Sequence, residues 1–228
     1  MKIQISILFL LTLLMGCSNS GQKNTADEKA KCKHSVPFGD IEICLPEIDG
    51  MTECYERPNV KVLADKFEYE GNEVKAFYIN NETYKKVDSL DKIVYDDYFK
   101  IYITKSMTGQ KAGTAQLDEM TKMLEGNFLQ ENWDELKGKL NKSLDFISVG
   151  QPVLVENYSP HKNIRTFIML VKYQMEGYEQ VIVGTMDILL IKDRLVWLAY
   201  YKNYDGEESL KKAKAKNDYI ALRVMEVN

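Results

Sequence analysis

Alternating apolar and polar positions predict short strands in the first half of the chain. Residues 36–46 alternate and stop at a proline, with a turn expected at Phe38-Gly39-Asp40. Residues 60–69 and 73–79 are rich in aliphatic and aromatic side chains and flank Glu70-Gly71-Asn72, which predicts a hairpin. Residues 98–104 are a further predicted strand, and residues 88–95 are expected to form one or two helical turns.

Between residues 114 and 144 the apolar positions change to a helical period. Large apolar side chains recur three or four positions apart, with a break near residues 126–132. This pattern predicts two amphipathic helices, each with one face to bury.

Strands return in the last third of the chain, at residues 153–157, 166–174, 180–191 and 194–201. The turns at residues 176–179 and 192–193 are short, so neighbouring strands must pair antiparallel. The run Ile188-Leu189-Leu190-Ile191 is apolar on both sides, which predicts that this meander is the centre of a sheet covered on both faces.

The final helix is marked by its charges. We expect Asp205 to cap its start, with Glu208 returning a bond to the amide of the cap. The pairs Glu207 with Lys211 and Glu208 with Lys212 have the i, i+4 spacing that stabilises a helix.

The same helix has one apolar face, which is interrupted by Asn217. If Asn217 is buried there, its side-chain amide needs a hydrogen-bond partner. The apolar residues of this face are Leu210, Ala213, Ile220, Ala221 and Val224. Together, the elements predict an α+β fold, with a largely antiparallel sheet and helices packed on its faces.

The order of elements resembles that of the PsbP-like family, which includes an extrinsic subunit of photosystem II, a Ran-binding import factor and bacterial lipoproteins. The resemblance is carried by Ile41-Glu42-Ile43-Cys44-Leu45-Pro46 with Gly50 soon after, and by Leu195-Val196-Trp197-Leu198 leading to the last helix. Where the family usually has an aromatic residue after that glycine, this chain has Met51. The resemblance spans most of residues 36–228 and implies an α+β sandwich. It carries over no catalytic residue to this chain.

The first sixteen residues have the pattern of an export signal. Lys2 precedes an apolar run of about a dozen residues, which is too short for a permanent membrane span. Leu14-Met15-Gly16-Cys17 resembles the lipobox of bacterial lipoproteins, in which the cysteine thiol receives diacylglycerol before cleavage on its amino side. The alternative is an ordinary secretory signal in which Cys17 is incidental.

The polar run after Cys17 suits a flexible tether between lipid and domain. We therefore divide the chain into a signal at residues 1–16, a lipidated cysteine and tether at residues 17–31, and a single domain at residues 32–228. We expect the lipid on Cys17 to attach the protein to a membrane, because two or three acyl chains anchor a protein stably. In a cell with two membranes, Ser18 resembles the sorting residue of outer-membrane lipoproteins.

The net charge argues against one class of partner. The whole chain has 30 basic and 34 acidic residues, and removing Lys2 with the signal leaves 29 against 34. This mildly acidic balance lacks the electrostatic footprint of a nucleic-acid-binding protein.

Three cysteines remain in the domain once Cys17 carries lipid. An oxidising compartment favours one disulfide and one free thiol. Cys32 and Cys44 flank the turn at residues 38–40 and would face each other across a hairpin, so we predict that pair, with Cys44–Cys54 as the rival. A zinc site is disfavoured, because the cysteine spacings are not ligand-like and only His34 lies nearby.

No catalytic motif accompanies the histidines His34 and His161. Three other groups of polar residues each have two interpretations. The glycine loop at residues 109–113 could bind an anion or serve as a flexible lead into a helix. The aspartates could bind calcium or cap helices, and the lysines could contact lipid headgroups or be solvated; they are Asp88, Asp91, Asp96 and Asp97, and Lys211, Lys212, Lys214 and Lys216. A tyrosine cluster, at Tyr200, Tyr201 and Tyr204, suits either a binding surface or a sheet edge.

The expected function is that of a non-catalytic envelope lipoprotein, without cofactor or metal, whose domain binds a protein partner or supports an assembly. The alternative is a small-ligand or lipid-binding pocket lined by residues such as Trp133, Phe167, Met169 and Trp197. An envelope hydrolase is the third hypothesis.

Overall fold

The computed structural model describes residues 32–88, 96–125, 131–134, 147–175 and 177–228. The described residues belong to one compact unit, Cys32–Asn228. This unit is an α+β domain, as the sequence predicts.

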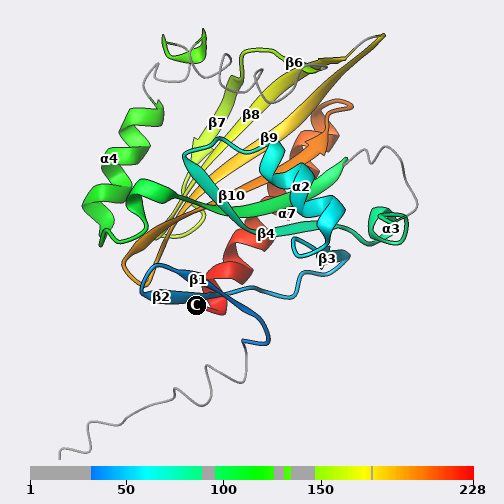
Figure 1. The fold of residues 1–228 in the computed structure, drawn as a ribbon. Coiled ribbons are helices and arrows are strands. Elements are labelled where there is room, and N and C mark those ends of the chain that lie inside the picture. The colour runs from blue at the N-terminus through cyan, green and yellow to red at the C-terminus, as the bar shows by residue number, and fades with distance from the viewer. Residues whose placement is uncertain (1–31, 89–95, 126–130, 135–146, 176) are drawn as a thin grey trace, which may run out of the picture. The chain divides into compact units, whose positions relative to one another are not determined.

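An eight-stranded antiparallel sheet is the centre of the domain (Figure 1). Its order is β3-β4-β5-β10-β9-β8, and both β6 and β7 pair with the far side of β8. The strands are β3 (Met51–Glu53), β4 (Asn72–Asn80), β5 (Asp97–Thr104), β6 (Ile147–Val149), β7 (Val153–Tyr158), β8 (Ile164–Met175), β9 (Tyr178–Ile191) and β10 (Arg194–Asn203). A separate hairpin joins β1 (Ser35–Phe38) to β2 (Ile41–Cys44).

The helices cover both faces of this sheet. Along β10, Val196 and Leu198 pack in the core that holds helix α7 (Glu207–Glu226) and the β1–β2 hairpin, whereas Leu195 and Trp197 pack towards α4 (Thr114–Glu125). Alternate residues of a strand point to opposite faces, so α7 and α4 lie on opposite sides. A further cluster on the α4 side packs α2 (Pro58–Lys66) against β4, and the shorter helical elements are α3 (Asn81–Tyr84) and the 3-10 turn Lys105–Met107.

The predicted late meander is confirmed, and its β9 and β10 lie inside the sheet between α7 and α4. A two-residue turn joins them, with positive φ at both Lys192 and Asp193. Two left-handed residues give the turn the twist of its flanking strands, which makes this tight connection possible.

The predicted hairpin at residues 60–79 is wrong in its first half, because residues 58–66 form helix α2. Pro58 stands in its first turn, where a missing N–H has no cost, and Val60 and Ala64 are buried one helical turn apart. Only β4 of that hairpin is a strand, and it pairs with β3 and β5.

Other boundaries also differ from the prediction. The single alternating run at residues 36–46 is divided into β1 and β2 by the turn predicted at residues 38–40, where Gly39 has φ of 60°. Of the two central helices, the first is α4, and most of the second lies outside the described residues, as do residues 89–95. The last helix begins after Gly206, so the cap predicted at Asp205 is wrong; instead the Ser209 hydroxyl accepts from the amide of Asp205.

Candidate functional site

The disulfide joins the start of the described domain to its first hairpin. Cys32 and Cys44 are bonded, with their Cα atoms 5.4 Å apart, and Cys54 is free and buried. This is the pairing that the turn at residues 38–40 predicts. Burial raises the pKa of the Cys54 thiol to about 12, so this cysteine is a core side chain and a poor nucleophile.

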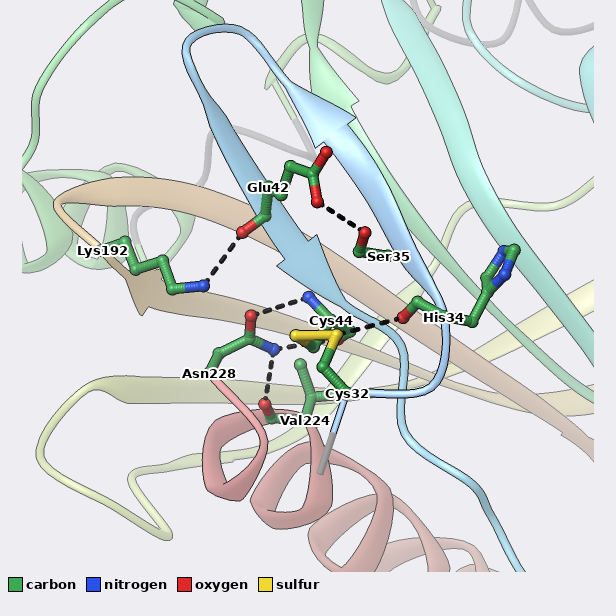
Figure 2. The surroundings of a disulfide bond; sticks show 8 residues. All are labelled: Cys32, His34, Ser35, Glu42, Cys44, Lys192, Val224 and Asn228. Carbon is green, nitrogen blue, oxygen red and sulfur yellow. Dashed lines mark hydrogen bonds between the residues drawn. A yellow bond between two sulfur atoms is a disulfide. The ribbon is translucent and has the colours of Figure 1, made fainter. Parts of the chain in front are cut away.

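Asn228, which follows α7, binds the backbone of Cys44 next to the disulfide (Figure 2). The Asn228 amide donates to the carbonyl of Cys44 and accepts from its N–H, both at 2.9 Å. It thus replaces a neighbouring strand for one residue of β2, and it also bonds the carbonyl of Val224 in α7. Cys17, where the lipid is predicted, lies outside the described residues. The point where the predicted tether would join the domain is held to the end of α7 through Cys44 and Asn228.

The two edges of the large sheet differ in kind. The β3 edge is three residues long and carries the polar residues Thr52 and Glu53, which suits a protected edge. The β7 edge is six residues long and exposes three consecutive aliphatic side chains: Val153 at 61%, Leu154 at 40% and Val155 at 44%. The pairing register with β8 shifts between Leu154 and Glu156. An exposed apolar edge of this kind has main-chain groups and apolar side chains that another chain could pair with.

The second half of β7 is fixed to α7. The Lys214 ammonium lies 2.5 Å from a Glu156 carboxylate oxygen and 4.1 Å from the centre of the Tyr158 ring. The Tyr158 hydroxyl donates to Asp218 at 2.7 Å. The edge is therefore apolar and open at its start, and polar and attached to the helix at its end.

A buried polar network lies between α7 and the sheet. The sequence predicted only that Asn217 would need a partner; it did not predict the rest of the network. Asp187 is fully buried, and its Oδ1 accepts from Thr166 at 2.5 Å and from the Asn217 amide at 3.0 Å. Thr185 donates to the oxygen of the same amide at 2.6 Å. Asp187 Oδ2 is buried without a partner. The signal in the sequence is a single aspartate in the most apolar strand.

The opposite face of the sheet buries an ion pair. The Lys100 ammonium on β5 lies 2.5 Å from Glu68, which follows α2, and both side chains are about nine-tenths buried. Asn72 donates to the other oxygen of Glu68 at 2.9 Å. The ammonium lies 5.1 Å from the ring centre of Tyr102 and 5.9 Å from that of Tyr201.

The other sequence candidates do not assemble into a site. The His161 ring accepts a hydrogen bond from the backbone N–H of Asn163 in its loop, and His34 is exposed. Three of the four aspartates point to different partners, Asp88 to Arg57, Asp96 to Asn80 and Asp97 to Lys202, and Asp91 lies outside the described residues. In the described ranges, no cluster of histidine, cysteine or acidic residues could hold a metal ion.

The remaining candidates are spread over the surface and core. The loop at residues 109–113 leads to α4, where the amide of Gly113 donates to Gln116. Lys214 and Lys216 are engaged by Glu156 and by the carbonyl of Asp49. The tyrosine cluster divides, because Tyr200 is buried on the α7 face and Tyr201 lies on the other face.

The predicted apolar pocket is packed at two of its four positions. Phe167 and Trp197 are buried together under α4, and Met169 and Trp133 are half-buried. A hollow of about 290 Å³ lies elsewhere, beside α2, and is lined mainly by polar residues that include Asp65, Glu68 and Glu73. These contacts do not support the lipid pocket that the aromatic residues suggested.

Comparison with known protein families and with characterised proteins finds no match for this chain. Among the residues that the structure describes, no helix is long and apolar enough to cross a membrane.

Proposed function

We propose that this protein is a cell-envelope lipoprotein, held on a membrane by lipid on Cys17, whose domain binds a partner protein along the β7 edge. The observation that carries the binding half is the run of three exposed aliphatic residues, Val153 to Val155, on a strand with one neighbour. The lipobox pattern at residues 14–17 supports the anchoring half.

The chemistry of the edge favours an extended segment of a partner. A strand that pairs on one side only offers main-chain donors and acceptors to a further strand, while exposed side chains supply apolar area. Because Glu156 and Tyr158 are already engaged by α7, the free part of the edge is the apolar half. A partner segment with aliphatic side chains at alternate positions would match it.

A photo-crosslinking residue placed at Val155 tests the binding half. Introduced into the protein in its own membranes, it should yield a defined adduct, and Val153→Lys should abolish that adduct. Val62 provides the control, because this valine is 70% exposed on α2 and stands outside the proposed surface. Equal adducts from both positions, or an adduct that survives Val153→Lys, would show that β7 is not the binding surface.

The anchoring half is tested by Cys17→Ser. The variant removes the sulfur that would carry the lipid and leaves the domain from Cys32 onwards unchanged. After detergent-free lysis, we expect the wild-type protein with the membranes, and the variant either soluble or retained by an uncleaved signal. A domain that is exported behind an ordinary secretory signal and still sediments with membranes at high salt would contradict lipid as the sole anchor.

A further inference from the structure

The network under α7 contains a buried carboxyl group, that of Asp187, whose hydrogen-bond donors carry no opposite charge. Asp187 lies on β9 with no exposed surface, directly opposite Thr166 of β8. Its donors, Thr166 and Asn217, are neutral, and both bond the same oxygen. A carboxylate in such surroundings loses its hydration without gaining a counter-ion, so the protonated form is favoured.

The groups facing Asp187 come from α7, β7, β8 and β10. Asp218 on α7 disfavours a second negative charge, and the Tyr158 hydroxyl on β7 is bonded to Asp218. Tyr200 on β10 is buried on the same face, and its backbone N–H donates to the Thr185 hydroxyl at 3.3 Å. The Lys214 ammonium on α7 is engaged with Glu156 and lies over the Tyr158 ring.

Two successive turns of α7 connect this network to the β7 edge. Asn217 bonds Asp187, and its neighbour Asp218 holds Tyr158 of β7. Lys214, one turn earlier, holds Glu156. A shift of α7 away from the sheet would therefore break the contacts that attach the polar half of β7.

We propose that Asp187 is a protonation-dependent latch: its neutral form seats α7 on the sheet and, through Asp218 and Lys214, holds the β7 edge, and its ionised form loosens both. The latch is a property of the domain and stands whether or not a partner binds β7.

The direction of the pH effect follows from the burial. Burial, opposed by the bonds from Thr166 and Asn217, raises the pKa of Asp187 from 3.8 to about 7. The folded domain then holds this proton more tightly than the unfolded chain does. The stability from this group is therefore fully present below the unfolded pKa of 3.8 and is lost as the pH rises from there through about 7.

The first test measures Asp187 itself. Carboxyl-carbon NMR of the wild-type protein should show one aspartate with a midpoint near pH 7, and Asp187→Asn should remove that signal. Thr166→Val deletes a bond that favours the anion, so it should move the midpoint upward. An Asp187 midpoint near pH 4 would overturn the latch, and because this measurement uses the wild-type protein it needs no variant to fold.

The second test measures the consequence. From pH 5 to pH 7, the melting temperature of the wild type should fall by roughly 3–5 °C per pH unit relative to Asp187→Asn. Hydrogen exchange, corrected for its intrinsic pH dependence, should rise in α7 and β7 of the wild type and stay flat in Asp187→Asn. The exposed Asp205→Asn is the control and should follow the wild type. Identical profiles for wild type and Asp187→Asn would overturn the latch, and faster exchange confined to α7 would overturn its link to β7.

Discussion

The two faces of the large sheet bury charged groups in different ways. On the α2 side, the Lys100 ammonium contacts the Glu68 carboxylate, so two opposite charges are buried together. On the α7 side, Asp187 has only neutral donors, and Oδ2 has none. The first arrangement depends on keeping both partners, whereas the second depends on a proton.

The faces also differ in how they are closed. The α7 side carries a twenty-residue helix whose end is bonded to β2 by Asn228, next to the Cys32–Cys44 disulfide. The α2 side is covered by shorter helices, and its cysteine, Cys54, is free. Burial alone does not determine how a charged group behaves, because the side chains that contact it decide which of its forms is stable.

The largest effect should come from breaking the ion pair. Glu68→Gln leaves the Lys100 ammonium buried without an anion, and we expect the free energy of unfolding in urea to fall by about 3–5 kcal/mol. Glu82→Gln is the matched control, because Glu82 pairs with Lys85 at the surface and its loss should not change stability measurably. A loss for Glu68→Gln of no more than about 1 kcal/mol would mean that the Lys100 ammonium reaches water.

Removing the disulfide should have the next largest effect. Replacing both Cys32 and Cys44 by serine frees a loop with a sequence separation of 12 residues. By the chain-entropy argument this costs about 3 kcal/mol of stability. Reduction of the wild type should cause the same loss, and the same reductant should leave the double variant unchanged. An unchanged midpoint after verified reduction would show that the hairpin is held by packing alone.

A smaller effect is expected from Asn228→Ala. The variant deletes the bonds to the backbone of Cys44, which are partly buried, and should lower stability by about 1 kcal/mol. Hydrogen exchange should rise at Cys44 and at the end of α7, and the α2 side should be unaffected. Faster exchange around α2 would contradict the separation of the two faces.

The smallest expected effect is the alkylation of the buried Cys54 thiol in the folded protein. Cys54 has a pKa raised by burial to about 12, so iodoacetamide at pH 8 should label it very slowly in the folded Cys17→Ser protein. Labelling should become rapid in urea, and Glu68→Gln should accelerate it if α2 loosens. Rapid labelling of the folded protein would show that the α2 side opens without global unfolding.

Local patterns in the sequence predicted much of the fold. The antiparallel meander follows from strand alternation and from turns too short for any other pairing, and the buried face of α7 follows from apolar spacing. The Cys32–Cys44 pair is predicted for the same reason, because a turn at Gly39 brings the two cysteines opposite each other. Each of these inferences needs only residues that are close in the chain.

Other features depended on contacts between distant residues. Residues 58–66 have the aliphatic content of a strand, and packing of Val60 and Ala64 against β4 makes them a helix. The aliphatic run Val153 to Val155 resembles a buried strand, yet the strand order places it at an edge. Glu68 and Lys100 are 32 positions apart, and Asp187 and Asn217 are 30 apart. Periodicity tells which side of an element is apolar, but only the tertiary structure decides what covers that side and which buried charge meets a partner.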